Sequence, residues 1–292
     1  MRARKRGTDL ETEFEAFQLP EMPHVIFEHP PLVLALCQVR YTSVLNVTNA
    51  SFVAPFQEAI KDQYPVVAAN PIHEIGVQFG SSPGEANILQ GNPSIQWQFT
   101  DQDDNWKIVL TPDFFSIETR VYEHFDDFLD RLRKALNALI QHIKPVSGIR
   151  IGLRYVNEIR PSNIDWPHII RRELLGPVIV PELINNAIQF TAVQQIQLRY
   201  PNEQGININH GLLPSGTIVA PRQGEEELLE RPFYLLDFDA FHEFPPPKLL
   251  IMNSGVICRD VKKYHRDIGR LFKWSVTEQY MSSLEVRHHD TN

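Results

Sequence analysis

Two aspartates in the last third of the chain have the spacing of a metal site. Asp237 and Asp239 are two residues apart, so on a strand they point to the same face. His242 and Glu243 follow directly, and paired carboxylates of this kind can hold a hydrolytic metal ion. The same acids alternate with apolar residues, a pattern typical of the solvated side of a half-buried strand. We favour this second interpretation.

A structural use for these acids is to neutralise arginines in neighbouring strands. Arg40 and Arg154 lie in mostly apolar runs that read as strands. A buried guanidinium needs a carboxylate partner, because an unpaired buried charge is costly. We therefore expect Asp237 or Asp239 to pair with Arg154 across a sheet, and we take all four residues as candidates for a binding site.

The other acidic motifs lack a residue that their chemistry requires. Asp101, Asp103 and Asn105 have the opening spacing of a calcium loop, but Trp106 stands where the loop needs glycine. A polar hairpin turn is the better interpretation.

A nuclease-like arrangement is also disfavoured. Asp113 and Glu118 are an odd number of residues apart, so on one strand they would face opposite ways. Neither a GxGxxG nor a GxxxxGK phosphate loop occurs, and there is no GxSxG nucleophile elbow. We expect no catalytic residue, no metal ion and no cofactor.

Composition restricts the partners and the compartment. The chain has 292 residues, with 28 Lys and Arg against 36 Asp and Glu, a formal net charge of -8 that opposes nucleic-acid binding. Its two cysteines, Cys37 and Cys258, cannot form a disulfide framework, and Cys37 reads as a small buried apolar residue. No apolar run is long enough to span a bilayer. We expect a cytoplasmic protein with no membrane contact.

The first part of the chain reads as a tail followed by an α+β unit. Residues 1–22 open with basic residues followed by polar and acidic ones, which is unlike a secretory signal. Residues 23–145 form the first unit. Its predicted elements are a strand at 32–41, a helix with Ser51 as N-cap that stops before Pro65, a loop at 70–93 with at most one strand at 75–79, a hairpin of strands 95–100 and 106–110, a strand at 114–122, and an amphipathic helix at 125–143.

The second part, residues 146–285, repeats this order of elements, and residues 286–292 form a tail. Its predicted elements are a strand at 149–159, a helix at 166–175, strands at 188–200, 205–210 and 233–244, an acidic loop at 222–231, and a long helix capped by Asp260 and reaching Leu284.

The two parts suggest an internal duplication. Each begins with a strand that contains a similar triplet, Val39-Arg40-Tyr41 and Leu153-Arg154-Tyr155. Strands joined by short turns are antiparallel and leave one apolar face, which a long amphipathic helix can cover. We predict an α+β fold of two similar halves, each a curved antiparallel sheet under a long helix. Its topology resembles the saddle of the TATA-binding-protein-like fold, an analogy that carries no function.

Three motifs occur in the opening strands of the two halves and in the closing helix. They are Pro30-Pro31-Leu32-Val33 with Val39-Arg40-Tyr41, the run RIGLRYVN at 150–157, and Phe272-Lys273-Trp274-Ser275-Val276-Thr277. These motifs are similar to those of an uncharacterised bacterial family, which is of about this length, is sporadically distributed, and is often found beside mobile or defence genes. That family has no established activity, so the resemblance assigns no functional residue.

Three functional hypotheses remain open. The first is a non-catalytic scaffold that binds a protein partner, forms a homodimer, and acts in a defence or mobile-element context. The second is a small-molecule binder or enzyme with a cavity between sheet and long helix, where Arg154, Asn157 or Asp237 would converge. The third is nucleic-acid binding, which requires a basic concave face despite the acidic total charge.

Overall fold

The computed structural model describes most of the chain between residues 27 and 284. The predicted tails at 1–22 and 286–292, and all but the last residue of the loop at 222–231, lie outside the described residues. The described residues are 27, 30–72, 75–79, 86–90, 94–184, 191–200, 202–217 and 231–284.

One large antiparallel sheet forms the centre of the molecule. It has ten strands, in the order β2-β5-β6-β7-β1-β8-β11-β10-β9, with β12 pairing to one end of β8. The strands are β1 (Leu32–Tyr41), β2 (Val66–Ile72), β5 (Ser94–Thr100), β6 (Trp106–Leu110), β7 (Phe114–Thr119), β8 (Ser147–Ile159), β9 (Ala192–Arg199), β10 (Gln204–Leu213), β11 (Phe233–Glu243) and β12 (Leu250–Ile251). The predicted α+β class is confirmed.

Strands β1 and β8 lie side by side at the centre of this sheet. Their antiparallel register runs from Leu32 opposite Asn157 to Tyr41 opposite Gly148. Outward from β1 the order is β7, β6, β5 and β2, and outward from β8 it is β11, β10 and β9. Strand β7 therefore lies next to β1, and β11 lies next to β8. Each of these two strands is the last long strand before a long helix.

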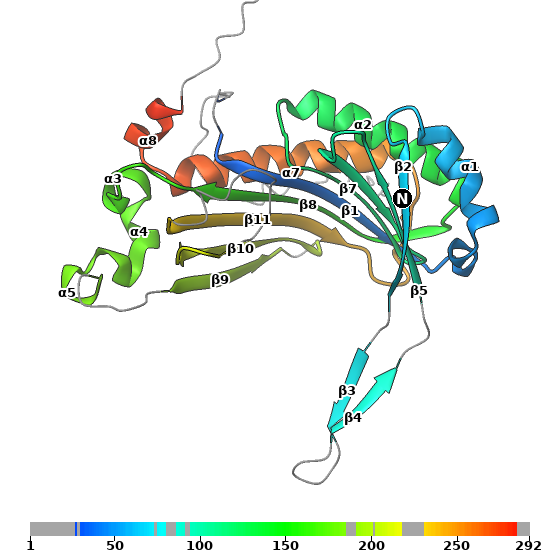
Figure 1. The fold of residues 1–292 in the computed structure, drawn as a ribbon, viewed down its shortest axis with the longest axis horizontal. Helices are drawn as coiled ribbons and strands as arrows, with labels where there is room; N and C mark the ends of the chain where they lie inside the picture. Colours follow the sequence, from blue (N-terminus) through cyan, green and yellow to red (C-terminus); the bar gives the residue numbers. More distant parts are fainter. Residues whose placement is uncertain are drawn as a thin grey trace, which may run out of the picture.

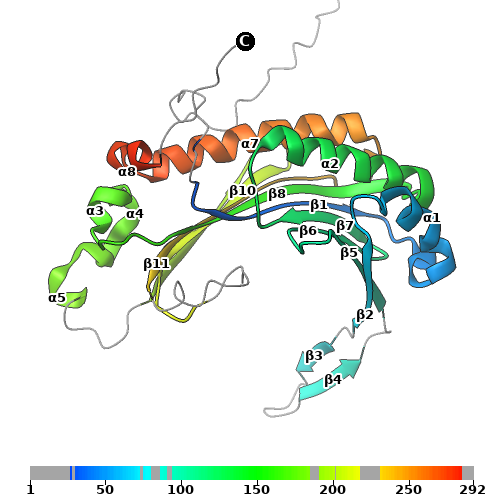
Figure 2. The ribbon, with the colours of Figure 1, turned by 45° about the horizontal axis from the view of Figure 1, so that its top comes forward.

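The three long helices lie on one side of the curved sheet (Figures 1 and 2). They are α1 (Ala50–Ile60), α2 (Phe125–Ala138) and α7 (Ser254–Ser275). A group of short helices lies at one end of the sheet in Figure 1: α3 (Trp166–Ile169), α4 (Arg172–Leu175), α5 (Pro181–Ile184) and α8 (Glu278–Ser283). None of the described helices is long and apolar enough to cross a membrane.

The core fills the layer between these helices and the sheet. Alternate side chains of β1 point into it, among them Ala35, Cys37 and Val39, and all three are fully buried. Leu153 and Tyr155 of β8 continue the same buried face. Cys37 is a free thiol, as predicted for a small buried residue, and burial raises its pKa.

Two helix predictions are wrong, one in its middle and one at its start. The predicted helix at 166–175 is split into α3 and α4, because Ile170 is extended and forms a β-bridge with Val276. Asp260 is not a cap: α7 begins earlier, and the Asn253 side chain accepts a hydrogen bond from the Val256 N–H.

The region predicted as loop at 70–93 contains more strand than expected. Strand β3 (Ile75–Phe79) is where it was predicted, but β4 (Ala86–Gln90) pairs with it, and β2 extends to Ile72. The β3–β4 hairpin projects from the sheet beyond β2 and β5 (Figure 1). Proline, glycine and asparagine mark turns locally, but pairing with a partner strand overrides that signal.

Two further boundaries shift. The strand predicted at 114–122 ends at Thr119, and the helix predicted at 125–143 finishes in a π-helical turn, Leu139–Ile143, after α2.

The N-cap of α1 provides a direct test of this local structure. The cap is Asn49 rather than the predicted Ser51, because the Asn49 carboxamide oxygen accepts from the Ser51 N–H at 3.0 Å. We expect Asn49→Ala to lower the free energy of unfolding by about 1 kcal/mol. Ser51→Ala should change it by less than about 0.5 kcal/mol, because no cap is lost. Urea unfolding of both variants measures the difference, and equal losses would contradict Asn49 as the cap.

Candidate binding face

The face of the sheet opposite the three long helices (Figure 1) carries the charged side chains of β8 and β11, as their register shows. Register places Arg154 of β8, Asp239 of β11 and Asn207 of β10 beside one another on this face. Because side chains alternate along a strand, these residues point away from the buried Leu153 and Phe238. We call this surface the open face.

Arg154 and Asp237 form a bidentate ion pair on the open face. Arg154 Nε donates to Asp237 Oδ1 and Arg154 Nη2 to Asp237 Oδ2, both at 2.8 Å. Asn209 Nδ2 also donates to Asp237 Oδ2, at 3.0 Å. The hydrogen bond with Asp237 raises the pKa of the Arg154 guanidinium. The predicted partner of Arg154 is confirmed.

The two members of this pair differ in exposure, which decides what the pair contributes. The Asp237 side chain is 4% exposed, whereas that of Arg154 is 42% exposed. An uncompensated buried carboxylate costs several kcal/mol, while an exposed pair contributes about 1 kcal/mol or less. The pair therefore serves mainly to neutralise Asp237, and it holds the half-exposed Arg154 guanidinium in a fixed orientation.

A second ion pair lies beside the first and was not predicted. Arg150 Nη2 donates to Asp239 Oδ2 at 2.7 Å, and Asn207 Nδ2 donates to the same oxygen at 3.2 Å. The Arg150 guanidinium lies over the Phe241 ring, 5.0 Å from its centroid. Gly152 leaves room for it, since a Cβ at that position would be 2.6 Å from Arg150 Nη1.

These two pairs and their amide partners form one continuous network across three strands. We call it the polar ladder, and its members are Arg150, Arg154, Asn207, Asn209, Asp237 and Asp239. Gln197 of β9 extends it, donating to Asn207 Oδ1 at 2.8 Å. A polar network whose members satisfy one another is rigid and specific.

The remaining cations of this face have acidic neighbours too. Arg199 donates to Glu243 at 2.8 Å, and Lys107 lies 3.6 Å from Glu118. The described part of the open face is therefore closely balanced in charge.

Arg40 lies on the open face but is not buried as predicted. Its side chain is 47% exposed, and Arg40 Nη2 lies 3.9 Å from Asp113 Oδ2. A surface pair at that distance contributes little to stability. Arg40 is the penultimate residue of β1 and the one exposed residue of that strand.

Asn157 does not join the other candidate residues. It lies on the helix-covered face, where Asn157 Nδ2 donates to the Leu236 carbonyl at 3.0 Å. Arg154 and Asn157 are three residues apart, so a regular strand sends them to opposite faces. The predicted convergence of Arg154, Asn157 and Asp237 in one cavity is wrong.

The acids of β11 are arranged for ion pairing rather than for metal binding. His242 lies opposite Ile151 and so faces the helix side, away from Asp239. Within the described residues, no group of three or more His, Cys, Asp or Glu could hold a metal ion. Asp101 accepts from the Asn105 and Trp106 N–H groups and so closes the β5–β6 turn, as its interpretation as a hairpin turn predicts.

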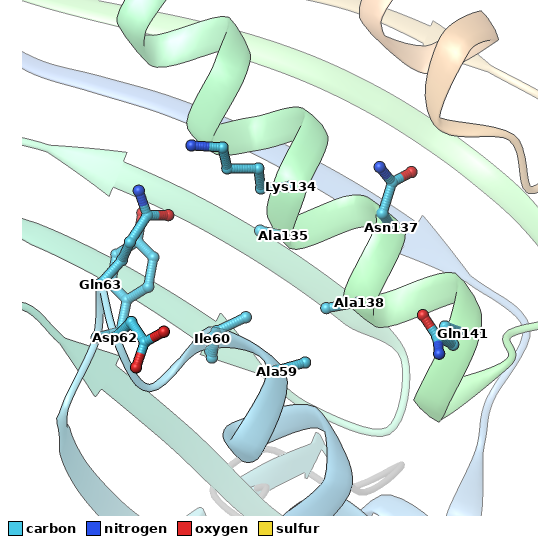
Figure 3. Close-up of a pocket in the computed structure, with 10 residues that line it drawn as sticks. Ala59, Ile60, Asp62, Gln63, Lys134, Ala135, Asn137, Ala138 and Gln141 are labelled. Carbon is cyan, nitrogen blue, oxygen red and sulfur yellow. The ribbon is translucent and has the colours of Figure 1, made fainter.

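A surface groove of about 460 Å³ lies between the end of α1 and α2. Figure 3 shows Lys134 of α2 pointing across it toward Gln63. Its lining contains no cysteine, serine or histidine, and its apolar part consists of alanines, Ile60 and the Tyr64 ring. This groove lies beside the core rather than between α7 and the sheet.

A chain of hydrogen-bonded side chains joins the sheet to α7, and sequence reasoning missed it. Tyr122 and Tyr155 hydroxyls are 3.3 Å apart, and Tyr155 Oη is 3.0 Å from His265 Nδ1. The His265 ring stacks on Phe125 at 3.8 Å. Burial raises the pKa of Tyr122 to about 12, so that phenol stays neutral at physiological pH. The chain satisfies polar atoms that would otherwise be buried alone.

A buried histidine, His210, lies on β10 and contacts Tyr234 of β11. Tyr234 Oη donates to the Leu174 carbonyl at 2.8 Å, so it accepts from His210 Nδ1 at 3.0 Å. Nε2 of His210 is buried without a hydrogen-bond partner among the described residues. Burial lowers the pKa of His210, because a second N–H would have no acceptor there.

In comparisons with known proteins, no family model and no curated protein matches this chain.

A double substitution tests the Arg154–Asp237 pair. Arg154→Met leaves a buried carboxylate without its cation, and we expect it to lower the free energy of unfolding by about 2 to 4 kcal/mol. Adding Asp237→Asn removes the buried charge and keeps an acceptor for Asn209. The double variant should therefore be more stable than Arg154→Met alone, by urea unfolding. Additive losses would refute the pairing.

The buried histidine predicts how stability depends on pH. The pKa of His210 is lowered in the folded protein, whereas in the unfolded chain it is about 6.5, so the unfolded chain binds more protons below that pH. The free energy of unfolding should fall as the pH is lowered through 6.5, and His210→Asn should reduce this slope. Urea unfolding at a series of pH values between about 7.5 and about 5 measures how the free energy of unfolding changes with pH. An unchanged slope in the variant would contradict this role.

Proposed function

We propose that this protein is a non-catalytic binding protein that holds a protein partner on its open face. The observation that supports this most is the polar ladder, a fixed array of donors and acceptors on a sheet face that no long described helix covers. Arg154 offers a half-exposed guanidinium whose orientation is set by Asp237. Arginine held in this way suits carboxylates and backbone carbonyls of a protein surface.

Charge favours a protein over a nucleic acid as the partner. A surface that binds phosphates gains affinity from cations that are free to release counterions. Here Arg150, Arg154 and Arg199 already face carboxylates at hydrogen-bonding distance, and the chain carries a net charge of -8. Balanced, paired charges instead give specificity between two protein surfaces.

The filled interior argues against a small-molecule site under the long helix. Cys37, Leu153, Val261 and Ile268 are buried in one continuous core between α7 and the sheet. The groove of Figure 3, whose lining includes Lys134, Asp62 and Tyr64, lies between α1 and α2 rather than under α7. An enzyme or small-molecule function therefore has less support than a protein-binding one.

The architecture also supports the duplication that we propose for the two halves. The orders β1-β7-β6-β5-β2 and β8-β11-β10-β9 run outward from a central antiparallel pair in the same sense. Such an arrangement resembles a TATA-binding-protein-like saddle, in which the open face is the concave one. The resemblance of the strand motifs suggests a cytoplasmic partner in a defence or mobile-element context.

Reversing one exposed charge on the open face tests this function. Arg40→Glu changes that face without breaking a buried pair, since Arg40 is only 3.9 Å from an exposed carboxylate. We expect it to weaken binding of the native partner about tenfold or more. Arg133→Glu on α2 is the matched control, because Arg133 is similarly exposed, at 44%.

The partner is identified by placing a photoreactive amino acid at Gln38 on the open face, or at Lys134 on the helix side, in the full chain. The proposal predicts one protein crosslinked from position 38, in a yield that Arg40→Glu reduces and Arg133→Glu does not. Crosslinks from position 134 alone, or to nucleic acid, would refute it, and so would a failure to crosslink anything from position 38.

A further inference from the structure

The two edges of the sheet differ in how they are protected. At one edge, β2 contains Pro71, which has no N–H to offer, and the chain continues into the projecting β3–β4 hairpin. At the other edge, β9 has no proline, lysine or acid. Among the described strands, β9 pairs with β10 on one side and with none on the other. Long unprotected edges of this kind are templates for strand addition.

The outer edge of β9 is exposed along most of its length. Residues 193–197 are all exposed, including Val193 at 49% and Ile196 at 39%. Exposed β-branched side chains favour an extended backbone that is ready to pair. The strand has eight residues, so its edge is about 27 Å long.

The backbone hydrogen bonds determine which residues point outward. Tyr200 N–H donates to the Gln204 carbonyl at 2.8 Å, so Tyr200 bonds toward β10. The Glu243 N–H donates to the Glu203 carbonyl, so Glu203 bonds toward β11 while Gln204, the next residue, bonds toward β9. In an antiparallel sheet, successive residues of a strand direct their backbone N–H and C=O groups alternately toward one neighbouring strand and toward the other. The outward N–H and C=O groups of β9 therefore belong to Val193, Gln195, Gln197 and Arg199.

We propose that two copies of this chain pair through their β9 strands, antiparallel about a two-fold axis perpendicular to the sheet. Such an axis keeps the open faces of both copies on the same side of the joined sheet. Odd-numbered residues of one β9 therefore pair with odd-numbered residues of the other, and even-numbered with even-numbered. The register that uses all four outward residues places Gln195 opposite Gln197 of the partner subunit and Val193 opposite Arg199 of the partner subunit. Ile196 then meets its own copy on the helix side.

The charges of β9 suit a second copy as the occupant. Arg199 is the only charged residue of the strand, and it is held by Glu243 at 2.8 Å and approached by Glu203 at 3.8 Å. Two chains that each carry a net charge of -8 can thus approach along a nearly neutral edge. One added strand pair buries less than the roughly 1,600 Å² of a standard stable interface, so we expect a reversible dimer in the micromolar range, at about 1–100 μM.

The first test is the oligomeric state of the full chain by sedimentation velocity. The wild type should form dimers reversibly with rising concentration. Gln195→Pro removes an outward N–H without removing a bond to β10, and it should yield a monomer that unfolds at an unchanged temperature. Gln195→Ala, the matched control, keeps the N–H and should keep the dimer. A monomeric wild type, or a dimer that Gln195→Pro leaves intact, overturns the proposal.

The second test is the register, by disulfide crosslinking. Non-hydrogen-bonded antiparallel pairs have Cα atoms about 4.5 Å apart, within reach of a disulfide. Ile196→Cys should therefore form a disulfide with its copy under mild oxidation, whereas Val193→Cys should not. The native Cys37 and Cys258 are buried and do not interfere. Crosslinking of Val193→Cys and not of Ile196→Cys would overturn this register.

Discussion

The alternation of side chains along each strand is the constraint on which the rest of this molecule depends. Helices α1, α2 and α7 cover one face of the sheet, so most side chains of β1 and β8 on that face are apolar, and the polar Asn157 donates to a backbone carbonyl there. The intervening side chains receive no helix cover. Where they are charged and partly buried, they must find partners on their own face. Arg154 and Asp237 do so across the β8–β11 pairing.

This constraint explains why the central charges occur as pairs with amides beyond them. Asp237 and Asp239 lie between a strand with arginines, β8, and a strand with asparagines, β10. Each carboxylate is thereby bonded from both sides, which a single ion pair would not achieve. The polar ladder is nearly neutral, because its two arginines are paired with its two aspartates. Its paired charges support our proposal of a protein partner over a polyanion.

Local pattern predicted much of the fold and part of the site. The amphipathic periods of 125–143 and of the strands on either side of it are strong, and the structure has those elements. The pairing of Arg154 with an aspartate followed from the cost of a buried charge. The prediction that Asn157 belongs to the same site is wrong, because the alternation of side chains along β8 puts Asn157 and Arg154 on opposite faces of the sheet.

Other features could not be predicted from local pattern. They depend on which residues of two paired strands lie opposite each other, and those residues are far apart in the sequence. The Arg150–Asp239 pair spans 89 residues, and Gly152 shows its purpose only when the Arg150 side chain is seen to lie over it. The same holds for Tyr122, Tyr155 and His265, which meet from three separate elements. Asn253 was overlooked as a cap because Asp260, an equally good cap by type, lies in a stronger apolar pattern. Residue type alone cannot choose between two such positions.

The central claim is that the polar ladder holds its arginines in place. The most direct test is nuclear magnetic resonance of arginine side chains in the full-length protein, comparing Arg154 and Arg150 with the exposed Arg133. The account predicts slow exchange of the Arg154 Nε–H with water and restricted rotation of both ladder guanidinium groups, against fast averaging at Arg133. Fast averaging at Arg154 equal to that at Arg133 would contradict it.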